Sequence, residues 1–129
     1  MTIARGRYIL LLNSDASLHP GALKTLVAYM DDHADAGMCG PQLLFPDGTI
    51  QPSCHGFATL WTHFCDMTFL DRLFPHSGLF AQYEMTYFDH RRERSVDHIM
   101  AAAILVRRDV IETVGLFDER LSIYYNDMD

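Results

Sequence analysis

The stretch RYILLLNSDASLHPGAL, from Arg7 to Leu23, decides the expected fold. Five apolar side chains run from Tyr8 to Leu12, which predicts a strand buried on both faces, as in parallel sheets covered by helices. Pro20 suits the first turn of a helix. The apolar residues that follow recur at the spacing of one helical face: Leu23, Leu26, Val27 and Met30. The order is therefore strand, polar loop, helix, and in open α/β sheets ligands collect at the carboxyl ends of strands.

Asp15 is the acid of that polar loop, and its spacing leaves two interpretations open. It caps or turns the loop with its own side chain, as aspartate commonly does. Alternatively, it holds a ligand at the end of the strand. The sequence pattern alone does not separate these two roles.

Composition predicts one folded domain and excludes some partners. The chain has 129 residues, of which 49% are hydrophobic, enough for a real core. Its formal net charge of -7 repels phosphate backbones and anionic lipid surfaces, so nucleic acid is not an expected partner. A phosphorylated ligand would need a divalent cation or local donors to overcome this field.

The cysteines indicate a reducing compartment, and the length of the apolar runs indicates whether the chain can span a membrane. Cys39, Cys54 and Cys65 form no C-x-x-C pair, so we expect free thiols. No signal-peptide pattern precedes the first strand. The longest apolar run, Ile99 to Val106, is too short to span a bilayer. We therefore expect a cytoplasmic chain without a transmembrane segment.

Local signals predict the remaining elements. HADAG ends the first helix with a glycine, and PDG makes a tight turn within a β-hairpin. The other expected elements are a short helix through Leu60, Trp61, Phe64 and Met67 followed by irregular chain, a charged surface loop from Asp89 to Ser95, a strand from Ile104 to Val106, and a helix from Asp109 to Val114 stopped by Gly115.

Five segments in this order resemble the family 2 glycosyltransferases, particularly the bacterial polysaccharide-building branch that often transfers rhamnose. They are GRYILLLNSD, HPGAL, GPQLLFPDGTIQ, VDHIMAAAILVRRDVIETVGLFDER and YYNDMD. The resemblance implies an α/β fold: a partial GT-A (Rossmann-like) nucleotide-diphospho-sugar transferase fold, with a mixed sheet and flanking helices. It also implies inverting transfer of a sugar from a nucleotide-diphospho-sugar donor to an acceptor hydroxyl, assisted by a divalent metal, in polysaccharide or cell-surface glycan synthesis.

The resemblance assigns the polar loop to the donor. Asn13, Ser14 and Asp15 stand at the family's D-x-D element, whose last carboxylate meets the metal on the donor diphosphate. Asp15 would thus hold Mg²⁺ or Mn²⁺ through hard oxygen ligation. Asn13 replaces the first acid of the element; its amide can still hydrogen-bond ribose or metal-bound water.

The resemblance also implies a catalytic base and an acceptor side. Asp127 occupies the place of the family's base, and Asn126 replaces the glutamate that usually precedes it. Asp97 and His98 match a stretch on the acceptor side, where Asn126 also contributes. Without the resemblance, His98 is a hydrogen-bonded structural histidine and Asp127 belongs to a charged chain end.

The resemblance further predicts that residues 1–129 are one incomplete domain, the central portion of an enzyme. The family's N-terminal nucleotide-binding units and its C-terminal tail are expected to be absent from it. The acceptor would be a glycan or a lipid-linked glycan, at the inner face of the membrane. Peripheral membrane contact and self-association stay open.

Two other classes compete with this interpretation. A haloacid-dehalogenase-type phosphatase also runs a buried strand into an acidic loop, but it needs an aspartate nucleophile where this chain has Asn13. The second class is a non-catalytic binding or interaction module. In that module the aromatic segment from Phe57 to Phe88 packs on a partner, whereas core packing is the ordinary role of such residues.

Overall fold

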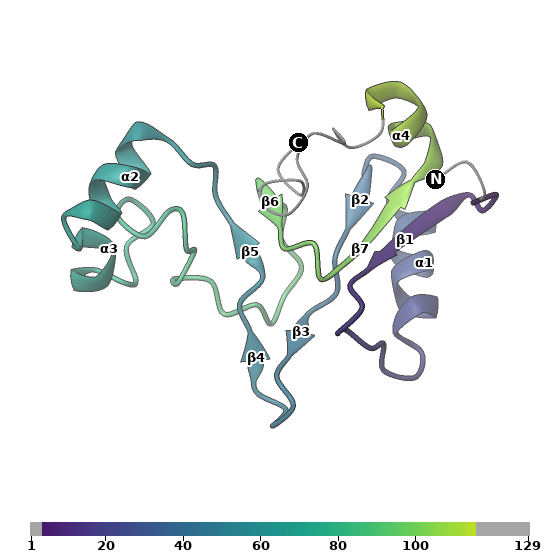
Figure 1. Ribbon diagram of the computed structural model, residues 1–129, viewed down its shortest axis with the longest axis horizontal. Helices are drawn as coiled ribbons and strands as arrows, with labels where there is room; N and C mark the ends of the chain where they lie inside the picture. The colour runs from purple at the N-terminus through teal and green to yellow at the C-terminus, as the bar shows by residue number, and fades with distance from the viewer. Residues whose placement is uncertain (1–3, 116–129) are drawn as a thin grey trace. The chain divides into compact units, whose positions relative to one another are not determined.

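The computed structural model describes residues 4–115 of the chain. These residues divide into two compact units, 4–41 with 100–115, and Gln42–Ile99. The prediction of a single domain stays a prediction. The elements are β1 (Tyr8–Leu12), α1 (Ala22–Asp32), β2 (Met38–Cys39), β3 (Leu43–Leu44), β4 (Ile50–Gln51), β5 (Cys54–His55), α2 (Leu60–Met67), α3 (Leu70–Leu73), β6 (His98–Ile99), β7 (Ala103–Arg107) and α4 (Arg108–Val114) (Figure 1).

The first unit is built on a three-stranded sheet in the order β1-β7-β2. Strand β1 has the bounds that the sequence predicts, but it pairs antiparallel with β7, with Leu10 opposite Leu105. β2 is also antiparallel to β7. The expectation of parallel pairing is therefore not met among the described strands. The expected burial of β1 on both faces is also wrong, because only Ile9 of the strand is buried and Leu12 is 42% exposed. An apolar run does not report the direction of the neighbouring strand or how fully it is covered.

Helix α1 covers one face of this sheet (Figure 1). Leu26 and Met30 of α1 pack with Leu105 of β7 in the buried core, and residues of β1, α1 and β2 surround them: Tyr8, Leu10, Val27, Ala36 and Cys39. Met30 is fully buried. The helix begins at Ala22, after Gly21 with a φ of 88°, and ends close to the predicted HADAG stop. The amphipathic pattern thus places α1 on the sheet.

Arg107, at the end of β7, binds carbonyls at the C-terminal end of α1 and in the residues just after it. Its guanidinium donates hydrogen bonds to the carbonyl oxygens of Met30, His33 and Ala36, the last two at 2.7 Å each. Carbonyls at a helix C-terminus lack partners within the helix and carry partial negative charge, so a cation stabilises them. Arg107 therefore fixes α1 to the sheet at the end where β1 begins.

The second unit contains two short antiparallel pairs, β3 with β4 and β5 with β6. The predicted PDG turn joins β3 to β4, and Asp47 accepts hydrogen bonds from the backbone and hydroxyl of Thr49. The predicted short helix is α2, which starts with a reciprocal capping box between Thr59 and Thr62. Helix α3 was not predicted; it lies in the segment expected to be irregular.

Three further local expectations are confirmed. Residues 89–95 form a loop without helix or strand, β7 covers the predicted strand, and α4 ends at Gly115 with a φ of 109°. All three cysteines are free, and burial raises the pKa of the Cys39 and Cys54 thiols. None of the helices in residues 4–115 is long and apolar enough to cross a membrane.

Candidate functional site

The polar loop after β1 presents its side chains to solvent. The backbone N–H of Asn13 donates to the carbonyl of Ala102 at 3.0 Å, which extends the β1–β7 ladder by one bond. The carbonyl of Asn13 then accepts from the N–H of Ala16 at 3.1 Å, which closes a turn. Asn13, Ser14 and Asp15 are all exposed. The loop thus lies at the carboxyl end of β1, as the sequence predicts.

Backbone groups close this turn, so Asp15 does not cap it. No described residue hydrogen-bonds or ion-pairs with the Asp15 carboxylate, and residues 4–115 hold no group of three or more acidic, histidine or cysteine side chains suited to a metal. A metal bound only by protein would not fit this loop. Mg²⁺ or Mn²⁺ shared between one carboxylate, water and ligand phosphates does fit, because such ions commonly use one or two carboxylates plus phosphate oxygens.

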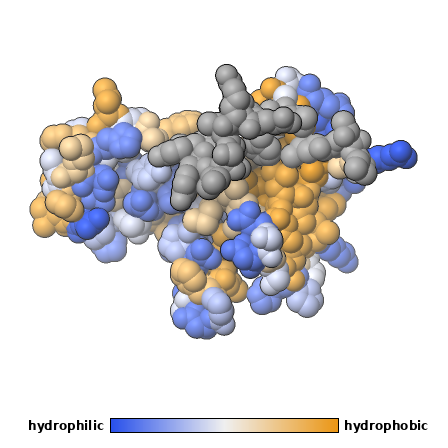
Figure 2. Space-filling view, viewed as in Figure 1, coloured by the Kyte–Doolittle hydropathy of each residue, from blue (hydrophilic) through white to orange (hydrophobic). Residues whose placement is uncertain are grey.

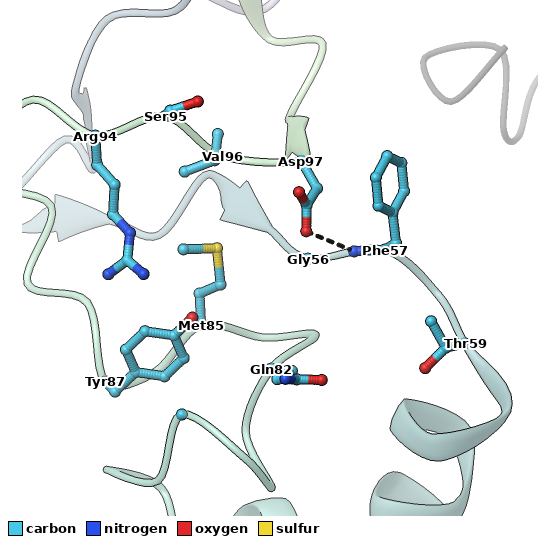
Figure 3. Close-up of a pocket in the computed structure, with 11 residues that line it drawn as sticks. Gly56, Phe57, Thr59, Gln82, Met85, Tyr87, Arg94, Ser95, Val96 and Asp97 are labelled. Atoms are coloured by element: carbon cyan, nitrogen blue, oxygen red, sulfur yellow. Dashed lines mark hydrogen bonds between the residues drawn. The ribbon is translucent and has the colours of Figure 1, made fainter.

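The second unit contains a cavity of about 340 Å³, a size typical of small-molecule sites (Figure 3). It is formed by the residues that follow β5, by the irregular chain after α3, and by the end of the charged loop before β6. Its lining residues are Gly56, Phe57, Thr59, Gly78, Gln82, Met85, Tyr87, Arg94, Ser95, Val96 and Asp97. Polar side chains therefore converge here from segments that are distant in sequence.

Asp97 links two walls of the cavity. One oxygen of its carboxylate, Oδ2, accepts a hydrogen bond from the backbone N–H of Phe57 at 3.3 Å (Figure 3). The neighbouring Gly56 is close to the opposite wall, because a Cβ added there would lie 2.5 Å from the carbonyl oxygen of Gln82. The Oδ1 atom of the exposed Asp97 is left as an acceptor for a ligand donor such as a hydroxyl.

Arg94 supplies the cation of the same cavity. Its guanidinium lies over the rings of Tyr87 and Phe88, 5.2 Å from each centroid, which restrains a long side chain that would otherwise be mobile. The cavity thus offers a guanidinium, a carboxylate, an amide at Gln82 and a hydroxyl at Ser95. This donor and acceptor set suits a polyhydroxylated ligand.

His98 does not line this cavity with Asp97. It lies in β6 opposite His55, and the two ring centroids are 5.8 Å apart. The structure therefore brings Asp97, but not His98, into the cavity. Asn126 and Asp127 lie outside the described residues, so the predictions made for them remain predictions.

Most residues of the cavity carry no signal in the sequence that predicts a site. Gln82 and Tyr87 lie in the aromatic segment for which no regular pattern was found, and Arg94 lies in the loop that was predicted to be a solvated surface. The cavity depends on non-local packing, so no spacing in the sequence reveals it. The one local signal was the charge of Arg94 close to Asp97.

Comparison with known proteins identifies the class. The family model described as glycosyl transferase family 2 matches residues 1–115. The chain belongs to this family, which implies a GT-A fold, and the described α/β units are part of such a domain. The matched range ends before Asn126 and Asp127.

Two kinds of relative are most informative. The chain is 28% identical over 122 residues to N-acetylglucosaminyl-diphospho-decaprenol L-rhamnosyltransferase of Mycobacterium tuberculosis, a match that covers 95% of this chain and 39% of that protein. It is 33% identical over 129 residues to O-antigen biosynthesis protein RfbC of Myxococcus xanthus, covering 98% of this chain and 9% of that protein. The chain thus spans well under half the length of these relatives. No solved structure gives a significant match.

Proposed function

We propose that this chain serves in inverting transfer of a sugar from a nucleotide-diphospho-sugar to the hydroxyl of a glycan or lipid-linked acceptor. The observation that carries the proposal is the position of Asp15 at the carboxyl end of β1, in a chain that belongs to glycosyl transferase family 2. Its carboxylate is exposed, and no described residue hydrogen-bonds to it. The names of the relatives, a rhamnosyltransferase and an O-antigen biosynthesis protein, support a role in cell-surface glycan synthesis.

On the donor side, Asn13, Ser14 and Asp15 would face the diphosphate. Asp15 would hold Mg²⁺ or Mn²⁺ with phosphate oxygens, and the bound ion would supply positive charge to the leaving diphosphate. The amide of Asn13 and the hydroxyl of Ser14 can donate hydrogen bonds to phosphate or ribose oxygens without adding negative charge. The loop would therefore bind an anion through one carboxylate and neutral donors.

On the acceptor side, the cavity of the second unit would bind the acceptor glycan. Oδ1 of Asp97 accepts from a sugar hydroxyl, and Gln82 and Arg94 donate to ring or hydroxyl oxygens. Asp127 would take the acceptor proton as the new bond forms between the acceptor oxygen and the anomeric carbon. The old bond breaks in the same event, its electron pair leaves with the diphosphate oxygen, and attack from the opposite face inverts the anomeric centre.

The first test concerns Asp15. Asp15→Asn should weaken Mn²⁺-dependent binding of uridine, guanosine or thymidine diphosphate by roughly tenfold or more, since it removes a charged metal ligand. Isothermal titration with and without Mn²⁺ measures this. Asp35→Asn is the matched control, because Asp35 is another exposed acid of the same unit. Equal losses in both variants would contradict the assignment.

The second test concerns Asp127. Asp127→Asn keeps size and hydrogen bonding but removes the basic lone pair, so sugar transfer should fall by about 10² to 10⁴ while nucleotide binding changes little. Asp129→Asn should matter less. Transfer is measured as release of nucleoside diphosphate in the presence of acceptor. Full transfer activity in Asp127→Asn would show that another residue is the catalytic base.

A non-catalytic binding module is the second candidate. It is favoured by the exposed apolar side chains of α2, since Leu60 and Met67 are 91% and 79% exposed. A module of this kind would show no transfer with any donor, and restoring an acid with Asn126→Glu would leave it inactive. Transfer that Asn126→Glu maintains or raises would exclude the module.

A further inference from the structure

Residues 90–97, which we call the cavity loop, are hydrogen-bonded at both ends to residues that flank β5. At the end of the loop, the carboxylate of Asp97 accepts from the backbone N–H of Phe57, which lies just after β5. At its beginning, Nε2 of His90 accepts from the backbone N–H of Ser53, which lies just before β5, at 3.4 Å. A change at either contact therefore reaches the side chains that this loop places in the cavity.

Both ring nitrogens of His90 contact backbone groups, and these groups fix which nitrogen carries the proton. Nδ1 lies 2.9 Å from the carbonyl oxygen of Phe88, which can only accept, so Nδ1 carries a hydrogen. The backbone N–H of Ser53 can only donate, so Nε2 has to be the unprotonated acceptor. His90 is therefore held as the neutral Nδ1–H tautomer.

The backbone of His90 is fixed independently of its ring. Its φ is 54°, in the left-handed region, where a residue other than glycine is uncommon and persists only when its surroundings determine the conformation. The side-chain amide of Gln42 donates to the carbonyl oxygen of His90 at 2.6 Å and contributes to this restraint. Because the backbone is held, a change at Nε2 has to be taken up by the ring or by Ser53.

A second proton on the His90 ring is incompatible with the contact to Ser53. Protonation of Nε2 by solvent turns the acceptor into a donor, so that two N–H groups face each other. Ser53 is only 3% exposed, and a buried backbone N–H that loses its acceptor is unfavourable. The neutral ring therefore stays at Ser53, whereas the protonated ring has to leave it.

The His90 ring also supports the residue that holds Arg94. Its centroid lies 4.6 Å from the centroid of the Phe88 ring, and the Arg94 guanidinium lies 5.2 Å from that same Phe88 centroid. In Figure 3 the Arg94 side chain points toward Met85 and Tyr87, which line the cavity with it. Displacement of the His90 ring removes a neighbour of Phe88, and a charged His90 ring places a second cation close to the aromatic ring that holds Arg94. Both effects weaken the restraint on Arg94.

Figure 2 shows hydrophilic side chains among apolar ones on the face of the second unit that it displays, so the charged groups near His90 have to be considered. The charged and titratable residues beside this ring and its contacts come from the chain before it, from its own loop and from β5: Tyr87, Asp89, Arg91, Arg92, Glu93, Arg94, Cys54 and His55. Histidine is the side chain that ordinarily changes charge between about pH 5 and about pH 8. Burial raises the pKa of the Cys54 thiol, which therefore stays neutral in this range. His55, whose Nδ1 lies 4.0 Å from a carboxylate oxygen of Glu84, is the group that an experiment has to distinguish from His90.

We propose that His90 is a positioning residue of the cavity. Its neutral ring holds the cavity loop against Ser53 and keeps Arg94 in the cavity, whereas its protonated ring leaves Ser53 and releases Arg94. Binding of the cavity's ligand is therefore weakened by acid. That this ligand is the acceptor glycan rests on the proposed function, whereas the coupling of His90 to the cavity does not. For sugar transfer, the KM for the acceptor should rise on acidification while kcat at saturating acceptor changes little.

Nuclear magnetic resonance of the unmodified chain measures this coupling without any ligand. In a series from about pH 8 to about pH 5, the ring nitrogen shifts of His90 should report the Nδ1–H tautomer at the alkaline end and the doubly protonated ring as the pH falls. The side-chain resonances of Arg94 should lose the ring-current shift that comes from the two aromatic rings beneath it. The methyl resonance of Met85, a buried residue of the cavity, should move with the same midpoint as the His90 ring.

Two variants separate titration of the ring from its structural role. His90→Gln supplies an oxygen near the position of Nε2 that accepts from Ser53 but does not titrate, so the resonances of the cavity should keep their alkaline form at every pH. His90→Asn keeps a donor for the Phe88 carbonyl and tolerates the positive φ but does not reach Ser53, so the same resonances should keep their acid form at every pH. His76→Asn is the matched control, since His76 is another exposed histidine of the same unit, and it should titrate as the unmodified chain does.

Three outcomes would overturn the proposal. The first is a His90 ring with its hydrogen on Nε2 at the alkaline end of the series. The second is a pH response of Arg94 that persists in His90→Gln, and its disappearance in His55→Asn would assign the coupling to His55. The third is an Arg94 signal that is unchanged when the His90 ring is protonated. No nucleotide or acceptor enters these measurements, so their failure leaves the Mn²⁺-dependent test at Asp15 unaffected, and failure of that test leaves the coupling at His90 standing.

Discussion

Asp31 lies where its charge is unfavourable by itself, in the last turn of α1, whose carbonyl end is negative. Three neighbours compensate. The Tyr8 hydroxyl donates to Oδ1 of Asp31 at 2.7 Å, the Arg7 guanidinium forms an ion pair with it at 3.1 Å, and Arg107 donates to the same Tyr8 hydroxyl at 3.2 Å. The hydrogen bond from Tyr8 is the largest cause that lowers the pKa of Asp31, and Arg7 adds to it.

This network predicts a specific acid sensitivity. Because the pKa of Asp31 is lower in the folded chain than in the unfolded one, its contribution is present above the ordinary aspartate pKa of about 4 and is lost as pH falls through the folded value. Asp31→Asn should therefore lower the thermal midpoint at neutral pH. The difference from the unmodified chain should shrink towards zero at the acid end of the series, as measured by calorimetry.

Asp32→Asn is the control for this series. Asp32 is the adjacent exposed acid of α1, and no described residue hydrogen-bonds to its side chain. Removing its charge from the negative end of the helix should be neutral or slightly stabilising. An Asp31→Asn difference that stays constant with pH would show that the loss comes from packing and not from the carboxylate.

At the scale of elements, strand β5 reaches the cavity through a close backbone approach. The N–H of Gly56 donates to the carbonyl of Tyr83 at 3.0 Å, and a Cβ at Gly56 would lie 2.5 Å from the carbonyl oxygen of Gln82. That contact involves backbone and not a flexible side chain, so the chain itself would have to move. The absence of a side chain at Gly56 therefore allows the backbone at Gly56 and the backbone at Gln82 to lie close together.

Gly56→Ala should push the backbone at residue 56 away from the backbone at Gln82. We expect a loss of about 1–3 kcal/mol in the free energy of unfolding, the usual cost of overpacking, measured by denaturant titration. Gly78→Ala is the matched control, because Gly78 lines the same cavity and a Cβ there would contact nothing within 4 Å. It should be neutral or slightly stabilising. Similar losses in both variants would mean that the close approach at Gly56 relaxes easily.

The elements that the sequence predicted well are those with local signals. The apolar run gave β1 with its observed bounds, PDG gave the β3–β4 turn, and helical spacing gave α2. Pairing of Leu10 with Leu105 was not predicted, because strand direction depends on chain that is distant in sequence. The outward face of α2 was also missed, since periodicity shows that a helix has an apolar stripe and does not show which way the stripe turns.

The residues of the candidate site also divide into those with a signal in the sequence and those without one. Asp15 could be proposed from the sequence because it lies in the polar loop after an apolar strand, and the structure leaves its carboxylate exposed, with no described residue hydrogen-bonded to it. Asp97 could be singled out through family resemblance. The partners of Asp97 in the cavity, Gln82 and Arg94, come from irregular chain whose path is set by tertiary packing. No local rule predicts such a path.

At the scale of the whole molecule, net charge opposes the proposed donor. A chain of -7 repels a nucleoside diphosphate, and one of its carboxylates, that of Asp15, lies at the proposed point of contact. Residues 4–115 also supply no cluster of acids that would hold a metal before the donor arrives. The cation is therefore expected to bind together with the diphosphate, and to bridge it to Asp15.

Salt should therefore have opposite effects on the binding of nucleoside diphosphate with and without metal. In a chelator, binding of nucleoside diphosphate should be weak and should strengthen as salt rises, because salt screens the repulsion between two anions. With Mn²⁺ present, binding should be at least about tenfold tighter and should weaken as salt rises, since the dominant contact is then an attraction. Isothermal titration across a salt series measures both slopes. The uncharged nucleoside is the control and should respond to neither metal nor salt. Tight diphosphate binding in the chelator would show that local donors outweigh the field of the chain, and the metal would then have no part in holding the donor.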